Sequence, residues 1–139
     1  MAVHMELSRI LIRKNLPYHT IELREVGGER VFAIEIGLNE AAAIERRLTG
    51  REARRPQTHE LLSSVIDTMG GKTERVVVND LVQDDQTGQG TFLARLYVRQ
   101  NGKLLNIDSR PSDAIALGIA TNVPIYVEDH VLDKVSKMP

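Results

Sequence analysis

Hydrophobic and polar positions change their period several times along the chain, and each change marks the boundary of an expected element. Weak alternation over residues 6–12 predicts an edge strand. Two further alternating segments, 20–23 and 30–36, flank Gly27 and Gly28. Glycine tolerates the positive φ of a tight turn, so this arrangement predicts a β-hairpin.

Helical periodicity follows the hairpin. Asn39 is a suitable N-cap, and apolar residues at helical spacing predict a helix over 40–48 that ends at Gly50. A second helix is predicted from Thr58, its expected N-cap, to Gly70. This second helix has the clearest amphipathic pattern of the chain, formed by Leu61, Leu62, Val65, Ile66 and Met69.

The second half of the chain repeats this order of strands and helix. β-Branched residues predict a strand over 75–82. The segments 91–98 and 103–107 predict a second hairpin, because Asn101 and Gly102 between them form a strong turn signal. We therefore expect two hairpins in one chain, each followed by a helix.

The helix after the second hairpin has no polar face. Pro111 opens it, and residues 114–122 carry no charge. Such a helix must be enclosed, either beneath a sheet or against another subunit, and the second option favours a homo-oligomer, first of all a dimer. A strand over 124–128 and a short helix from His130 complete the pattern. The expected fold is α+β: a single domain with two related β-hairpin–helix units and a mixed or antiparallel sheet packed by helices.

The two units also match residue by residue across a separation of 73 positions. In each copy, one acid closes a strand and a second acid lies in the first turn of the following helix. The matched positions are Ile34 with Ile107, Glu35 with Asp108, Glu40 with Asp113, Ala41 with Ala114, Ala43 with Ala116 and Ile44 with Leu117. A pseudo-twofold axis between the units would bring the acids of the two strand ends together.

These acids are the best candidate site in the sequence. Clustered carboxylates bind Mg²⁺ or Mn²⁺, so we expect Glu35, Asp108 and Asp113 to hold a divalent ion. His59 lies where the second helix begins, and the helix field there disfavours the imidazolium, so the ring is suited to accept a proton. His59, Asp108 and Asp113 form the predicted catalytic set. A structural alternative stays open, because the helix dipole alone favours an acid in a first turn and Asp108 can pair with the neighbouring Arg110.

Charge is distributed unevenly along the chain. The formal net charge is −1, so the protein as a whole does not attract nucleic acid. Five arginines nevertheless fall within ten residues: Arg46, Arg47, Arg51, Arg54 and Arg55. Guanidinium groups suit phosphate oxygens, so this segment and Arg110 are predicted to bind the phosphates of a nucleic acid. A solvated helix end followed by a polar loop explains the five arginines without a ligand.

Length and composition fit one globular domain. The 139 residues are 42% hydrophobic and 27% charged, which is typical of such domains. We expect residues 5–135 to form the domain and residues 1–4 to be a cloning remnant or a disordered N-terminus. No segment approaches the ~20 apolar residues of a membrane helix. The chain has no cysteine, which excludes disulfides and thiolate sites, and we expect a cytoplasmic location.

Several motifs resemble a known family. They are Arg55-Pro56-Gln57-Thr58-His59-Glu60-Leu61-Leu62, Asp80-Leu81, Thr91-Phe92-Leu93-Ala94-Arg95-Leu96 and Ile107-Asp108-Ser109-Arg110-Pro111-Ser112-Asp113-Ala114-Ile115-Ala116-Leu117. In this order and spacing they resemble the bifunctional nuclease domain family over residues 5–135. The resemblance implies an oligomeric α+β domain with the nuclease activity on DNA and RNA that is attributed to some members.

The resemblance also implies site residues. Carried over residue by residue, the motifs single out His59, Asp108, Arg110, Ser112 and Asp113. Glu35 enters only through the internal match. Two positions depart from the family pattern: Leu93 stands where an aromatic is expected, which removes a stacking ring, and Asn122-Val123 replaces a turn of small residues.

The sequence therefore supports two hypotheses from different classes. The leading one is a nuclease that hydrolyses phosphodiester bonds of DNA or RNA with a divalent metal, and that has no membrane partner. The alternative is a non-enzymatic ligand-binding or oligomeric assembly module. In that case the turn at residues 109–113 is a structural joint, and the acids pair with Arg110 and Arg95 instead of binding a metal.

Overall fold

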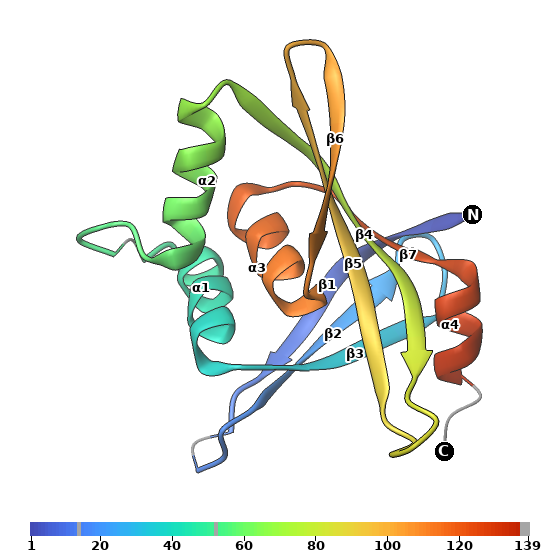
Figure 1. The fold of residues 1–139 in the computed structure, drawn as a ribbon. Helices are drawn as coiled ribbons and strands as arrows, with labels where there is room; N and C mark the ends of the chain where they lie inside the picture. Colours follow the sequence, from blue (N-terminus) through green and yellow to red (C-terminus); the bar gives the residue numbers. More distant parts are fainter. Residues whose placement is uncertain (14, 52, 137–139) are drawn as a thin grey trace.

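The computed structural model describes residues 1–13, 15–51 and 53–136, which form four helices and seven strands (Figure 1). The elements in chain order are β1 (Ala2–Leu11), β2 (His19–Glu25), β3 (Val31–Ile36), α1 (Leu38–Thr49), α2 (Thr58–Thr68), β4 (Gly71–Gln83), β5 (Gly90–Gln100), β6 (Lys103–Ser109), α3 (Pro111–Thr121), β7 (Ile125–Glu128) and α4 (Asp129–Ser136). All seven strands belong to one mixed sheet with the order β3-β2-β1-β7-β4-β5-β6. The predicted α+β fold is thus confirmed.

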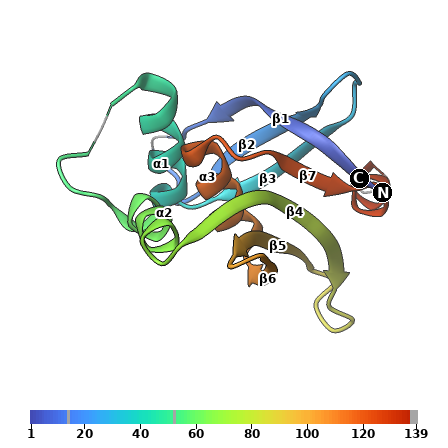
Figure 2. The same cartoon turned by 90° about the horizontal axis from the view of Figure 1, so that it is seen from above.

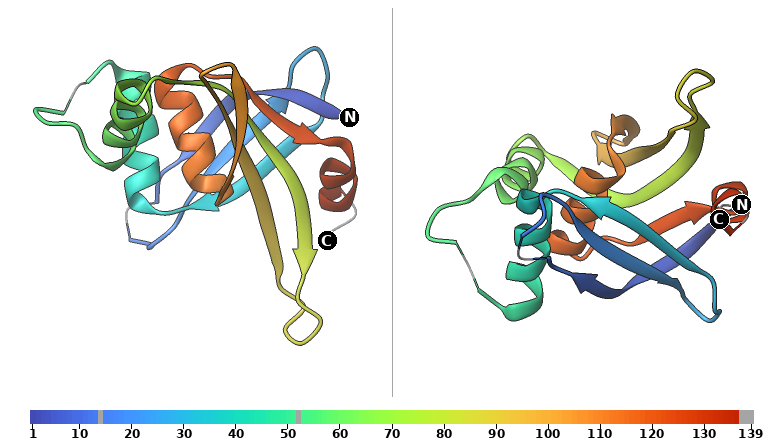
Figure 3. Two further views of the ribbon diagram at one scale, coloured as in Figure 1. Left: turned by 45° about the horizontal axis from the view of Figure 1, so that its top comes forward. Right: turned by 90° about the horizontal axis from the view of Figure 1, so that it is seen from below.

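The sheet is strongly curled, and α3 packs against its strands β3, β4 and β5 (Figure 2). Seen from above, β1–β3 lie on one side and β4–β6 on the other, with β7 between them (Figure 2). The helices α1, α2 and α3 gather at one end, whereas α4 lies at the other (Figure 3). Only the β4–β7 pair is parallel; the other neighbouring strands run antiparallel.

The first strand is interior to the sheet through residues 2–5, which pair with β7. Its residues 6–11 pair, within the described part of the chain, with β2 alone, as the edge position expected for residues 6–12 requires. It pairs antiparallel with both β2 and β7. It also begins earlier than expected, because Ala2, Val3 and His4 pair with residues 126–128 of β7. Residues 2–4 are therefore part of the sheet in the structure. The sequence around β1 contains no signal for this pairing, since the partner strand lies far away in the chain.

Both predicted hairpins are confirmed. Gly27 has φ of +75° in the first turn, and Asn101 and Gly102 have φ of +52° and +77° in the second. Each hairpin is followed by a helix, so β2-β3-α1 and β5-β6-α3 share one topology. The structure therefore contains the two hairpin–helix units that the chain pattern indicates.

The helix caps differ from those predicted. The N-caps of α1 and α2 are Gly37 and Gln57, both extended, whereas Asn39 and Thr58 already lie inside the first turns. An N-cap needs extended backbone just before the helix, and the chain turns into each helix earlier than the side-chain preferences suggest. The helix α1 ends at Gly50, as predicted, and Gly50 has the left-handed conformation with φ of +72°.

The apolar helix α3 lies in the core of its own protomer. Ile115 and Leu117 are 0% and 1% exposed, and α3 packs against α1, α2 and the sheet. Burying such a side chain stabilises the fold by roughly 1.5–3 kcal/mol. Because the same chain encloses α3, this helix gives no argument for a second subunit. In the described part of the chain, no helix is long and apolar enough to cross a membrane.

Candidate functional site

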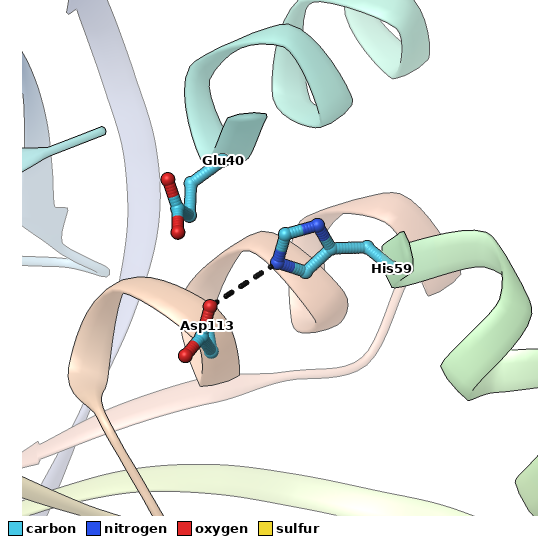
Figure 4. Close-up of side chains that lie close together, drawn as sticks. All are labelled: Glu40, His59 and Asp113. Carbon is cyan, nitrogen blue, oxygen red and sulfur yellow. Dashed lines mark ion pairs between the residues drawn. The ribbon is translucent and has the colours of Figure 1, made fainter. Parts of the chain in front are cut away.

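Three helices begin close together, and each contributes one side chain to a common cluster (Figure 4). Glu40 is the third residue of α1, and Asp113 is the third residue of α3. His59 is the second residue of α2. The unpaired backbone N–H groups of a first turn give each helix start a partial positive charge, which stabilises both carboxylates there.

The three side chains are within the reach of a single ion. The Nε2 atom of His59 lies 3.4 Å from Oδ1 of Asp113. One nitrogen or oxygen atom from each of Glu40, His59 and Asp113 can be chosen so that all lie within 4.8 Å of one another. Glu40 and His59 are 9% and 5% exposed, whereas Asp113 is partly open to solvent. The cluster therefore has a buried wall and one accessible side.

Arg110 lies on the accessible side and pairs with both acids. Its Nε donates to Oδ2 of Asp113 at 2.8 Å, and its Nη2 donates to Oε1 of Glu40 at 3.4 Å. The hydrogen bond to Asp113, with the charges of Asp113 and Glu40, raises the pKa of Arg110. The guanidinium is nevertheless at the surface, because the Arg110 side chain is 72% exposed. Arg110 thus compensates the acids without sealing them.

Gly37 makes room for the carboxylate of Glu40. A Cβ atom at Gly37 would lie 2.7 Å from Oε2 of Glu40, closer than real contacts allow. The backbone of Gly37 is extended (φ −79°), so the conformation itself suits any residue. A side chain at this N-cap would therefore require the flexible carboxylate of Glu40 to move.

The donor set fits a divalent cation. Two carboxylates and one imidazole suit Mn²⁺ or Zn²⁺, and the carboxylates alone suit Mg²⁺. Bonds of roughly 2.1 Å place neighbouring ligand atoms about 3.0–3.4 Å apart, which matches the 3.4 Å between His59 and Asp113. The three helix starts add partial positive charge beside such an ion, which favours an anionic ligand there.

The structure brings together some of the predicted site residues and separates others. His59, Asp113 and Arg110 meet, as described above. Asp108 lies apart on β6 with its side chain 79% exposed, and its nearest cation is Arg95 at 3.9 Å. Glu35 lies on the exposed face of β3. Among the described residues, neither Asp108 nor Glu35 belongs to the cluster, so the predicted convergence of the strand-end acids is not observed.

Glu40 is the site residue that the sequence-based set omitted. Its signal was nevertheless present, because the internal match places Glu40 on Asp113. The dipole of α1 is sufficient to explain an acid at position 40, so the sequence alone gives no reason to place Glu40 near Asp113. Only the packing of α1, α2 and α3 shows that the two first-turn acids face the same space.

The arginine-rich segment splits into two parts. Arg46 is mostly buried, and its Nη2 forms an ion pair with Oε1 of Glu60 at 2.8 Å. This pair joins α1 to α2. Burial alone would raise the pKa of Glu60, but the backbone at this helix start and Arg46 hold that pKa below its usual value. Arg47 and Arg51 line a cavity of about 340 Å³ together with Arg46 and Glu60. Arg54 and Arg55 are exposed in the following loop.

Comparison with known proteins identifies relatives across most of the chain. The model of the bifunctional nuclease domain matches residues 21–139. An uncharacterized protein of Mycobacterium tuberculosis is 40% identical over 110 residues, which cover 79% of this chain and 62% of that protein. Bifunctional nuclease 2 of Oryza sativa subsp. japonica is 27% identical over 120 residues, covering 84% of this chain and 35% of the rice protein. Bifunctional nuclease 1 of the same subspecies is 24% identical over 124 residues, covering 86% and 36%. The chain thus spans 62% of the mycobacterial protein and about a third of each rice protein.

Proposed function

The chain belongs to the bifunctional nuclease domain family, and we propose that it hydrolyses phosphodiester bonds of DNA or RNA with the help of Mg²⁺ or Mn²⁺. One observation carries this proposal: Glu40, His59 and Asp113 converge from three helix starts beside the exposed Arg110. Two rice proteins that match over most of this chain are named bifunctional nucleases, which supports the same reaction class.

Each residue of the cluster has a distinct role in this proposal. Glu40 and Asp113 would hold the cation, which supplies the positive charge needed when a phosphodiester is attacked. His59 would accept the proton of the attacking water, and Oδ1 of Asp113, which lies 3.4 Å from Nε2, would stabilise the imidazolium that results. The guanidinium of Arg110 binds a non-bridging phosphate oxygen, for which its exposure is well suited.

The remaining phosphate contacts would come from the arginine-rich segment. Arg47, Arg51, Arg54 and Arg55 form no ion pair with another described residue, so their guanidinium groups are available to a nucleic acid backbone. Arg46 serves a structural role because Glu60 already occupies it. Metal binding by Asp108 and Glu35 stays a prediction from the sequence, and the same assay tests it.

Cleavage of single- and double-stranded DNA and RNA, with Mg²⁺ or Mn²⁺, tests the proposal. We expect Asp113→Asn and Glu40→Gln to lower the rate by about 10²-fold or more, whereas the exposed loop variant Asp85→Asn retains wild-type activity. Asp108→Asn distinguishes the observed cluster from a site formed by the strand-end acids Glu35 and Asp108, because only the strand-end site requires Asp108. Equal cleavage by the wild type and Asp113→Asn would identify a contaminating nuclease and refute the proposal.

One observation favours a non-enzymatic module as a second candidate. Arg110 bonds to both Glu40 and Asp113, so the acids are already charge-compensated without a cation. On this hypothesis the turn before α3 is a structural joint that ties α3 to α1. Removing an acid should then destabilise the protein equally with and without divalent ions, and the wild type should bind no divalent ion.

A further inference from the structure

The helices α1, α2 and α3 and the loop after α1 together line a cavity of about 340 Å³. This volume lies at the lower end of the ~300–1,000 Å³ that is typical of small-molecule sites. Small residues leave this room, and those described are Ala43, Gly50, Ala53 and Ala120. The cavity therefore suits one compact chemical group rather than an extended ligand.

The charged residues that line this cavity are mostly positive. Those described are Glu60 and three arginines, Arg46, Arg47 and Arg51, and we call the cavity the arginine cavity. The pKa of Glu60 is lowered, so its carboxylate is charged at neutral pH and compensates Arg46, with which it forms an ion pair. Arg47 and Arg51 form no ion pair with another described residue. Two guanidinium charges therefore stay available to a ligand.

Two guanidinium groups in a compact cavity match a phosphomonoester. Near pH 7 a phosphomonoester carries a charge of about −1.5 to −2 and has three oxygens that accept hydrogen bonds. A phosphate within a nucleic acid strand carries only one negative charge, and the strand continues on both sides of it. Guanidinium groups bind phosphate oxygens through paired hydrogen bonds. The arginine cavity thus favours a phosphate at the end of a ligand over a phosphate within a chain.

The arginine cavity lies close to the cluster at the three helix starts. His59 belongs to that cluster, and the next residue of α2, Glu60, lines the cavity. Along α1, Arg47 follows Glu40 by seven residues, which corresponds to about 10 Å at a rise of 1.5 Å per residue. A terminal nucleotide can bridge a gap of this order. One strand end can therefore reach the cavity and the cluster together.

We propose that the arginine cavity binds the terminal phosphate of a nucleic acid strand, so that the protein recognises strand ends. This inference rests on the proposed function for the source of the ligand, because the cavity itself recognises only a phosphomonoester. A strand end held in the cavity presents a linkage near that end to the cluster. Recognition of the end belongs to the cavity and hydrolysis belongs to the cluster, so each can be tested without the other.

Binding of short single-stranded oligonucleotides without divalent ions tests the proposal. One strand carries a 5′-phosphate, a second carries a 3′-phosphate, and a third has a hydroxyl group at both ends. We expect fluorescence anisotropy to show that one phosphorylated strand binds the wild type about tenfold or more tightly than the unphosphorylated strand, and that Arg51→Gln abolishes this preference. Arg54→Gln is the matched control, because Arg54 is an exposed arginine of the same loop that does not line the cavity. It should weaken the binding of all three strands alike.

A second variant tests the space in the cavity rather than its charge. Ala120→Leu fills part of the cavity and leaves the arginines unchanged, so the preference for the phosphorylated strand should again be lost. Circular dichroism checks that the variants are folded. A preference that Ala120→Leu preserves would place the terminal phosphate outside the cavity and contradict the inference.

The remaining outcomes separate the inference from its alternatives. Equal affinities of the wild type for all three strands, or a preference that Arg51→Gln leaves intact, would overturn it. Inorganic phosphate that binds only when Arg51 is present, without any gain from a terminal phosphate on a strand, would identify a free phosphate compound as the ligand and would also overturn it. A wild type that prefers strand ends but cleaves nothing refutes only the proposed hydrolysis. Cleavage without a preference for ends in binding refutes only this inference.

Discussion

Replacing Asp113 by asparagine distinguishes a metal site from a structural joint, because only a metal site makes the effect of the substitution on stability depend on divalent cations. Asp113 faces His59 with one carboxylate oxygen and Arg110 with the other. Asparagine keeps the size of the side chain but removes its charge. The variant therefore tests the charge of Asp113 without creating a cavity.

The effect without a cation should be small. The ion pair with Arg110 is largely exposed, so its loss destabilises by about 0–1 kcal/mol. The loss of an acid from a first helical turn adds roughly 0.3–1 kcal/mol. Relief of the repulsion between Asp113 and Glu40 opposes both changes. For a chain of 139 residues, 1 kcal/mol corresponds to about 3 °C in Tm, and we expect a shift of this size or less.

The effect with a cation should be larger. A cation at a hundred times its Kd stabilises the wild type by about 2.7 kcal/mol, or about 9 °C. If Asp113→Asn weakens binding about a hundredfold, the same concentration only equals the new Kd and stabilises by about 0.4 kcal/mol, or about 1 °C. Thermal unfolding of both proteins across a Mn²⁺ titration measures this difference. Equal Mn²⁺-induced shifts in both proteins would refute a metal site that uses Asp113.

Three further predictions concern the surroundings of the cluster. Arg110→Gln removes the cation that compensates both acids, so isothermal titration should show tighter Mn²⁺ binding but weaker oligonucleotide binding; weaker Mn²⁺ binding would contradict the geometry. Gly37→Ala should shift the carboxylate of Glu40 and weaken Mn²⁺ binding about tenfold while the protein stays folded, and unchanged affinity would show that binding does not require the position that this carboxylate has beside Gly37. The pKa of Glu60 is lowered in the folded protein, so the ion pair of Glu60 with Arg46 contributes its full stabilisation above about pH 4.5, the ordinary pKa of a glutamate. This stabilisation is lost as the pH falls through the lower pKa of the folded state. Glu60→Gln should therefore lower Tm at neutral pH and flatten its decrease below about pH 4.5, and parallel curves for both proteins would count against the pair.

Local pattern predicted the elements of this fold well, and tertiary pairing limited the rest. The turns at Gly27 and Asn101 have the positive φ that their residue types indicate. The uncharged helix after Pro111 is enclosed, as its composition requires. The interior position of residues 2–5 in the sheet could not be predicted, because their partner β7 lies near the other end of the chain. The outward orientation of α2 was hidden for a related reason: periodicity shows that an apolar face exists, but not what covers it.

The candidate site shows the same division between local and tertiary information. Alternation in β3 buries Phe32, Ile34 and Ile36, so Glu35 must lie on the opposite, exposed face. The matched Asp108 is also exposed on its strand. The sequence pattern thus already contained the reason why the strand-end acids point away from the helices.

The first-turn acids follow a different geometry. Glu40 and Asp113 occupy the third position of helices that follow equivalent hairpins, so the two units present the same carboxylate at the same place. These positions meet because α1 packs against α3, and α2 then closes the space with His59. The partial positive charge of three helix starts would repel a cation, but the two carboxylates make the local charge negative. The backbone N–H groups of the helix starts still favour an anion that approaches the site. The proposed hydrolysis of a phosphodiester requires a site that could hold a cation and attract a phosphate at once. The cluster that could do so arises from the packing of α1, α2 and α3 rather than from any single motif.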